Sequence, residues 1–435
     1  MAGCADLRIL KASFEVGARP QAVTSVIERM RSRKFGTAAT HANGVPYADD
    51  VANFGICSVL FHMAVRPNIQ QSELLLRDAS KSTPRGGALV GEQNDIRYYA
   101  ASPRRLMNGP KATGMGYWSI NPYVGCALGC AYCYARYAHR YAAERLAAGA
   151  RLDGGDSLPT DDMPPWLAFE RRIMVKREAA ALVRRELGRS VTLNALRREA
   201  VVIGTATDPY QPAERRFLIT RGILGVLAEQ TDLRVTIITK SPLVTRDIDL
   251  LARINERSRV SVHVSLITID RELARCLEPR APTPEARLRA IARLRKNGIR
   301  VGVNCMPVLP GITDAPAMIE ELILALKDVD ASYVSACALR LQSAARDRYL
   351  PFIAATFPEL AGKYARAYAR SHQVGEKYRA GLRDRFASTC ARHGLAFGHR
   401  DEDGAAEGRD GDNRGGADEE DVDAAAALSQ FAMAL

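Results

Sequence analysis

Residues 119–140 read SINPYVGCALGCAYCYARYAHR and place Cys126, Cys130 and Cys133 in a CxxxCxxC pattern. Three thiolates so close together along the chain can converge on one metal centre. A 4Fe-4S cluster has four irons, so three cysteines leave one iron without a protein ligand and open to a small molecule. The pattern therefore predicts an open iron–sulfur cluster held by these three cysteines.

Zinc and a disulfide are the alternatives for the three cysteines. Structural zinc sites use paired CxxC units and four protein ligands, and ferredoxins use a CxxCxxCxxxCP run, so neither spacing matches. The other cysteines are scattered without the spacing of a disulfide framework: Cys4, Cys57, Cys276, Cys305, Cys337 and Cys390. A zinc or disulfide arrangement is therefore the weaker interpretation, and no auxiliary cluster is expected.

The aromatic residues beside the last cysteine carry a family resemblance. The CxxxCxxC run, with Tyr132 before Cys133 and Tyr134 after it, resembles the radical S-adenosylmethionine (SAM) enzymes. The string WSINPY leading into the run, and the later GTATDPYQPAE, resemble the spore photoproduct lyase-like branch of that superfamily. The resemblance extends from about Ala101 to about Ala345.

This resemblance implies two cofactors, a 4Fe-4S cluster and SAM. In the superfamily the methionine part of SAM chelates the open iron, and one electron from a flavodoxin or ferredoxin reductant cleaves SAM to methionine and a 5′-deoxyadenosyl radical. That radical abstracts hydrogen from the substrate, while the protein supplies binding and position. The chain is accordingly expected to be a radical SAM enzyme whose substrate the sequence does not identify.

Beyond the cysteines, short β-branched segments alternate with longer amphipathic ones. This alternation indicates parallel strands joined by crossover helices. The segments predicted as strands are 169–176, 200–207, 234–240, 260–266, 300–306 and 332–339. Six such units predict an α/β fold built as a partial (β/α)6 barrel of the radical SAM type, with N- and C-terminal extensions.

One predicted helix has clear boundaries, between the fourth and fifth predicted strands. Thr283 can cap it, Pro284 fits its first position, and Gly298 stands where it must end. Its apolar stripe is expected to consist of Leu288, Ile291, Ala292 and Leu294.

Length and composition set the domain organisation. A chain of 435 residues with 47% hydrophobic residues can hold two or three domains. We expect a poorly specified N-terminal extension at 1–95, a radical SAM core at 96–345 with its cluster loop at 126–133, a helical C-terminal extension at 346–399 and an acidic, disordered tail at 400–435. No apolar run long enough for a membrane span and no secretory signal are evident, so we expect a cytoplasmic protein without a membrane partner.

The formal charge of +12 is unevenly distributed. Residues 401–423 carry eleven acidic side chains against Arg409 and Arg414, a net charge of −9, which leaves +21 on the rest of the chain. A basic body is compatible with a nucleic acid or another polyanionic substrate. Ordinary solvated helix faces rich in arginine explain the same charge, so nucleic-acid binding stays open.

Polar residues follow the predicted strands, where parallel barrels collect their reactive groups. Thr207 and Asp208 end the second predicted strand, Lys240 the third and Ser265 the fourth. The resemblance implies that the region of Thr207 and Asp208 contacts the methionyl amino group, Lys240 the methionyl carboxylate, Ser265 the ribose and Tyr132 the adenine side. The glycine-glycine-glutamate of the superfamily is absent, and turn formation, solvation and helix capping are the ordinary alternatives.

Hydrogen transfer offers two further candidates. Tyr134 matches a tyrosine that the lyase branch uses near the substrate radical. Where that branch carries a hydrogen-donor cysteine, this chain has Thr205 or a neighbour, and a hydroxyl O–H bond is too strong for that role. Cys305 and Cys337, near the ends of the fifth and sixth predicted strands, can offer a thiol instead, with inert packing as the alternative. Cys305 is taken as the candidate.

Several functions remain in competition. Repair of a DNA photolesion is favoured by the branch and by the basic body, and Thr205 argues against it. A non-catalytic iron–sulfur protein for electron transfer or sensing is a second rival, and Lys240 and Ser265 argue against it because an electron carrier needs no cofactor pocket. A zinc-binding structural module is the third. No Ser-His-Asp set or HExxH string supports a hydrolase.

Overall fold

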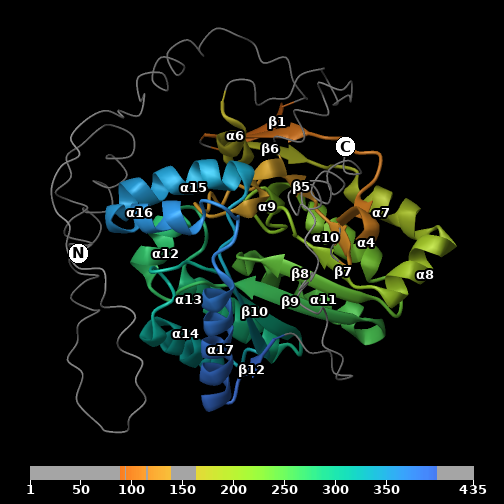
Figure 1. Ribbon diagram of the computed structural model, residues 1–435. Helices are drawn as coiled ribbons and strands as arrows, with labels where there is room; N and C mark the ends of the chain where they lie inside the picture. Colours follow the sequence, from red (N-terminus) through yellow and green to blue (C-terminus); the bar gives the residue numbers. More distant parts are fainter. Residues whose placement is uncertain (1–88, 94, 114–115, 139–162, 399–435) are drawn as a thin grey trace, which may run out of the picture. The chain divides into compact units, whose positions relative to one another are not determined.

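Figure 1 shows the computed structural model of the chain. The structure describes residues 89–93, 95–113, 116–138 and 163–398. Most of the expected N-terminal extension and the whole acidic tail lie outside the described residues. Among the described helices, none combines the length and hydropathy that a membrane span requires.

A mostly parallel sheet forms the body of the described fold. Its order is β12-β11-β10-β9-β8-β7-β4-β3, and every neighbouring pair is parallel except β3–β4. The strands are β3 (Met107–Asn108), β4 (Trp118–Ile120), β7 (Val201–Ile203), β8 (Arg234–Thr239), β9 (Arg259–Ser265), β10 (Arg300–Val308), β11 (Tyr333–Ala338) and β12 (Ala396–Phe397). The six strands from β4 to β11 make the predicted partial barrel.

A smaller sheet carries the cysteine loop at one edge. Its order is β1-β2-β6-β5, with bounds β1 (Leu89–Gln93), β2 (Ile96–Ala100), β5 (Tyr123–Val124) and β6 (Arg172–Val175). The segment 169–176 was predicted as the first barrel strand, and this is wrong: it contains the end of α6 (Pro165–Arg171) and then β6. The first barrel strand is β4, which has only three residues and therefore no periodic signal.

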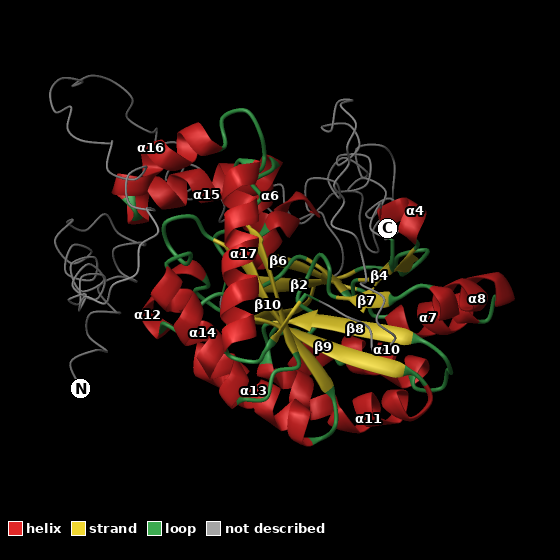
Figure 2. Cartoon of the chain, turned by 60° about the horizontal axis from the view of Figure 1, so that its bottom comes forward, coloured by secondary structure: helices red, strands yellow, loops and turns green. Residues whose placement is uncertain are grey.

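Helices pack against the large sheet, since α11 contacts β9 and α13 contacts β10, and Figure 2 shows both helices on one side of these strands. The helices that follow the barrel strands are α9 (Glu214–Phe217), α10 (Ile219–Leu227), α11 (Ile248–Arg257), α12 (Arg271–Leu277), α13 (Pro284–Lys296) and α14 (Pro316–Asp328). The remaining helices are α4 (Pro110–Thr113), α7 (Ala179–Leu187), α8 (Ser190–Arg198), α15 (Ser343–Thr356), α16 (Pro358–Ala367) and α17 (Glu376–Arg392), with short 3-10 turns η1 (Tyr134–Arg136) and η2 (Pro242–Asp247).

The predicted boundaries of α13 are confirmed, and its predicted stripe is partly wrong. Thr283 accepts a hydrogen bond from the Ala286 amide, Pro284 is the first helical residue, and Gly298 has a φ of 73°. Ala292 is exposed, whereas the buried positions include Arg287 and Ala290. The stripe was misplaced because an arginine was not expected to face inward. Arg287 faces inward because it pairs with the buried carboxylate of Glu278.

The inner wall of the barrel is polar. In β8, exposure alternates strictly: Val235, Ile237 and Thr239 are buried toward the helices, and the intervening residues face inward. Side-chain contacts show which residues of the neighbouring strands also face inward. Thr236 Oγ1 lies 3.2 Å from Ser261 Oγ, and the Tyr333 hydroxyl contacts His263 Nε2. The inner wall comprises Arg234, Thr236 and Ile238, then Arg259, Ser261, His263 and Ser265, then Arg300, Gly302 and Asn304, then Tyr333, Ser335 and Cys337.

Candidate functional site

The cysteine loop follows β5 and lies over the carboxyl ends of the barrel strands. Cys126 and Cys130 are buried, Cys133 is half-buried, and all three are free thiols. Backbone hydrogen bonds fix the loop from several elements: the Cys126 amide donates to the Phe169 carbonyl (2.8 Å) and the Ala131 amide to the Leu277 carbonyl (2.9 Å). The three thiols are therefore held in place by the protein itself.

Gln211 holds the loop through its side chain. Its Oε1 accepts from the Ala127 amide (2.9 Å), and its Nε2 donates to the Gly125 carbonyl (3.1 Å) and to Thr207 Oγ1 (3.0 Å). Thr207 Oγ1 in turn donates to the Gly125 carbonyl (2.6 Å). Gln211 is fully buried and was not among the predicted site residues, although it belongs to the GTATDPYQPAE string. It lies four positions after Thr207, and this spacing was the available signal.

Burial acts on all three thiols of the loop. Burial raises the pKa of Cys126 to about 12, and the neighbouring Asp208 and Cys133 add to the rise. Burial likewise raises the pKa values of Cys130 and Cys133, so the thiolates need a bound cation. Within the described residues, no three Cys, His, Asp or Glu side chains are placed to share one metal ion. Cysteine thiolates are the protein ligands of a 4Fe-4S cluster, and three of them would leave one iron without a protein ligand.

Asp208 connects the ends of β7 and β8. Its Oδ1 accepts from Thr239 Oγ1 (2.7 Å) and from the Tyr210 amide (2.8 Å), and its Oδ2 accepts from the Lys240 amide (2.7 Å). Burial raises the pKa of Asp208 despite these bonds. The carboxylate is thus already occupied by protein donors, which fix the backbone from which Lys240 projects.

Lys240 is a largely buried cation above the loop. Its side chain is 17% exposed, and its Nζ lies 4.0 Å from Glu278 Oε1 and 5.7 Å from the centre of the Tyr132 ring. Burial disfavours its charge, but Cys130 and Glu278 outweigh this and raise its pKa. Lys240 is therefore protonated at neutral pH, as binding a carboxylate requires.

Glu278 and Arg287 form a buried pair that sequence reasoning missed. The two side chains are each 1% exposed and are joined by a short ion pair, and the Tyr132 hydroxyl donates to the same carboxylate. Arg287 also donates to the Ser265 carbonyl (3.0 Å). Burial would raise the pKa of Glu278, but Arg287 and Lys240 outweigh it and lower the pKa. The pair thereby fixes Tyr132, Lys240 and the end of β9.

Tyr134 stands at the mouth of the site. It is 53% exposed, and its hydroxyl donates to the Thr205 carbonyl through a short hydrogen bond. The Thr205 hydroxyl is itself engaged by Ser119 Oγ (2.8 Å) and Asn121 Nδ2 (3.0 Å). Hydrogen bonds therefore hold Thr205 against the segment that leads into the cysteine loop. Of the two residues, Thr205 is buried and Tyr134 is exposed to solvent.

The structure places Cys305 away from the site. Cys305 is 1% exposed and adjoins Cys390 of α17, so burial and this neighbouring thiol raise its pKa. It pairs in register with Ala336, one position off the inner wall, which makes it a helix-facing residue. The prediction of Cys305 as a hydrogen donor is therefore wrong, because its side chain faces the helices and not the inside of the barrel. Cys337 is exposed and belongs to the inner wall.

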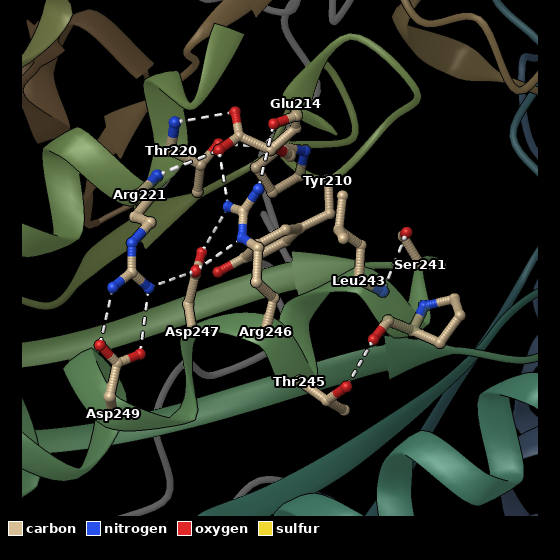
Figure 3. Close-up of polar contacts among 12 residues, drawn as sticks. Tyr210, Glu214, Thr220, Arg221, Ser241, Leu243, Thr245, Arg246, Asp247 and Asp249 are labelled. Carbon is tan, nitrogen blue, oxygen red and sulfur yellow. Dashed lines mark hydrogen bonds and ion pairs between the residues drawn. The ribbon is translucent and has the colours of Figure 1, made fainter. Parts of the chain in front are cut away.

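A second polar network ties the loops after β7 and β8 to each other (Figure 3). Buried Glu214 accepts from the Tyr123 hydroxyl (2.5 Å) in the strand that leads to the cysteines, and pairs with Arg246 of η2 (3.0 Å). Arg246 also pairs with buried Asp247 (2.7 Å), and Arg221 connects Asp247 to the exposed Asp249. The loops that carry Thr207 and Lys240 are thus fixed relative to the cysteine strand.

Comparison with known proteins agrees with this geometry. A sequence profile of the Radical SAM superfamily matches residues 120–323. An uncharacterised protein of Mycobacterium tuberculosis is 35% identical over 292 residues, which cover 67% of this chain and 79% of that protein. An uncharacterised protein of Methanocaldococcus jannaschii is 27% identical over 221 residues, covering 50% of this chain and 70% of the relative.

Among solved structures, spore photoproduct lyase in complex with dinucleoside spore photoproduct matches with 14% identity and a TM-score of 0.47, over 72% of this chain and 87% of the lyase. This degree of likeness says nothing about substrate. The profile and the mycobacterial relative, together with the cysteine loop over a partial barrel, establish that the chain belongs to the radical SAM superfamily.

Proposed function

We propose that the protein is an enzyme that cleaves SAM reductively and uses the resulting radical to abstract hydrogen from a substrate. The observation that carries this proposal is the convergence of three thiols, two buried and one half-buried, and a largely buried lysine at one end of the barrel. When bound, the 4Fe-4S cluster and SAM supply one-electron cleavage of a carbon–sulfur bond, which yields a 5′-deoxyadenosyl radical. An electron carrier needs no pocket for a cofactor carboxylate, which Lys240 would bind.

Individual residues take the following roles in this proposal. Cys126, Cys130 and Cys133 ligate the cluster, and Lys240 binds the methionyl carboxylate, because a desolvated carboxylate requires a charged donor. Ser265 lies at the end of β9 for contact with the ribose. Tyr132 is held by Glu278 and lies on the adenine side.

Thr207 and Asp208 act differently from what the sequence implied. The Thr207 hydroxyl and the Asp208 carboxylate are bonded to the protein, so we assign them to positioning the cysteine loop and Lys240 rather than to direct contact with the methionyl amino group. Tyr134 remains the residue proposed to lie near the substrate radical, since it is exposed next to Cys133.

An activity assay under anaerobic conditions tests this proposal. The protein is reconstituted with iron and sulfide, SAM and dithionite are added, and 5′-deoxyadenosine is quantified beside a Cys130→Ala control. Formation that requires both dithionite and Cys130 supports the proposal. If the protein holds an intact cluster and forms no 5′-deoxyadenosine, the proposal is wrong and an electron-transfer or sensing protein is favoured.

The net charge of +21 outside residues 401–423 favours DNA lesion repair as the second candidate. Arg234, Arg259 and Arg300 are the first residues of β8, β9 and β10, at the end of the barrel opposite the cysteine loop, and the strands β8 to β11 contain no Asp or Glu. An excess of positive charge over the barrel strands suits a polyanionic substrate. Binding of an oligonucleotide should then weaken steeply with salt, because each neutralised phosphate releases counterions. A flat salt dependence would leave a small substrate as the better choice.

A further inference from the structure

A second group of charges contacts the cysteine loop from elements outside the large sheet. We call it the arginine cluster: Arg136 of η1, Arg171 of α6, Arg280 after α12 and Arg348 of α15, together with the carboxylates Glu170 and Asp95. The helices α6 and α15 contact each other and lie side by side in Figure 1. None of these residues has a part in the proposed binding of SAM.

The arginine cluster contacts the backbone of the cysteine loop directly. Arg136 Nη2 donates to the carbonyl of Cys130 (2.6 Å), and Arg136 Nη1 pairs with Glu170 (2.6 Å). A Cβ on Gly129, whose φ is 67°, would lie 3.0 Å from Glu170 Oε2. The amide of Arg280 donates to the carbonyl of Leu128 (3.2 Å). Any group that docks on the cluster is thus close to the metal ligands.

The arginine cluster carries excess positive charge that reaches the surface. Four arginines face two carboxylates, and the Glu170 carboxylate is buried among three of them. The side chains of Arg171, Arg280 and Arg348 are 36%, 29% and 22% exposed.

An aromatic ring adjoins these charges. The Arg348 guanidinium lies 5.5 Å from the ring of Trp166, which is half-buried at the start of α6. Arginine and tryptophan are the residues enriched at protein interfaces and at their energetic centres. The cluster therefore combines steering charge with an aromatic contact.

We propose that the arginine cluster, with Trp166, is the docking surface for an acidic one-electron carrier protein of the flavodoxin or ferredoxin type. This inference rests on the proposed function, which requires such an electron. Positive charge attracts the acidic carrier, and the short path through Arg136 and the Cys130 carbonyl brings the redox centres near each other. In the transfer, a flavodoxin hydroquinone becomes a semiquinone and the cluster gains one electron.

The experiment compares two double variants of the full-length, reconstituted protein. Arg171→Gln with Arg280→Gln neutralises the exposed part of the arginine cluster and leaves Arg136 and Arg348 to pair with Glu170. Arg253→Gln with Arg293→Gln makes the same charge change at exposed positions of α11 and α13. Cluster reduction is followed by stopped-flow absorbance with purified flavodoxin hydroquinone and, in parallel, with dithionite.

We expect the first variant to slow reduction by flavodoxin roughly tenfold at low ionic strength, and the difference to shrink as salt screens the charges. Reduction by dithionite should remain at the wild-type rate, and the control variant should resemble wild type with both reductants. Equal slowing in both variants, unchanged flavodoxin rates, or equal slowing with dithionite would overturn the proposal. Because cluster reduction is read directly, a lack of 5′-deoxyadenosine would reject the proposed function without deciding the docking surface.

Discussion

Replacing Lys240 by methionine should separate binding of SAM from stability of the fold. The Lys240 ammonium is the protonated group placed above the cysteine loop, and methionine keeps an unbranched chain of similar length without the charge. Glu278 does not become an unpaired buried charge, because its other oxygen keeps Arg287. The substitution therefore removes a ligand contact and leaves the buried pair intact.

The magnitude follows from the type of bond lost. A hydrogen bond to a charged group contributes about 1.5–3 kcal/mol. At 1.4 kcal/mol for each factor of ten, the affinity for SAM should fall between about 10-fold and about 100-fold. The free energy of unfolding should change much less than it does when a buried pair is broken.

Equilibrium dialysis of SAM against the reconstituted protein measures this affinity, with iron and sulfide contents showing that the cluster is intact. Arg289→Gln, an exposed change on α13, is the matched loss of one charge. If Lys240→Met binds SAM as well as Arg289→Gln does while both keep their clusters, Lys240 does not bind the carboxylate and the assignment of the pocket is wrong.

Three further outcomes are expected. Arg287→Gln should lower the free energy of unfolding by roughly 3–5 kcal/mol, because it removes the nearer cation from buried Glu278 and leaves only Lys240, 4.0 Å away, whereas Arg289→Gln should leave the urea midpoint unchanged. Alkylation of the folded protein should modify Cys337 and spare Cys305, and peptide mass spectrometry showing the reverse would refute the assigned register of β10 and β11. The cluster-free protein should lose stability as pH rises from about 9 toward about 12. Folding raises the pKa of Cys126 from 9.0 to about 12, so in this range the unfolded thiol loses its proton and the folded thiol keeps it. Urea titrations at several pH values should show a smaller loss of stability for Cys126→Ala than for the wild type.

The sequence predicted the parts of the site that a local pattern or a strand end can reveal. The cysteines lie within one short loop, and Lys240 directly follows a strand with clear alternation. Glu278 and Arg287 were missed because nothing local ties Glu278 to Tyr132, from which 146 positions separate it. Only the folded partial barrel brings these side chains together.

Strand direction accounts for the other errors. A shift of one residue reverses which face a side chain occupies, so Cys305 and Cys337 could not be distinguished without the register of β10 against β11. That register is irregular between Cys305 and Val308. The missing first strand has a related cause, since the three residues of β4 are defined by pairing with β7 and not by their own sequence.

The charges around the cysteine loop bear on how the proposed cluster would accept an electron. Lys240 and Arg287 approach the loop with Glu278, and the arginine cluster contacts it with Glu170 and Asp95. Both groups have more cations than carboxylates. Three thiolates and an added electron make the centre more negative, and nearby positive charge stabilises that reduced form and raises its potential. If so, neutralising Lys240 should lower the potential of the cluster even before SAM binds, whereas a potential identical to wild type would mean that solvent and the cluster's own ligands set it.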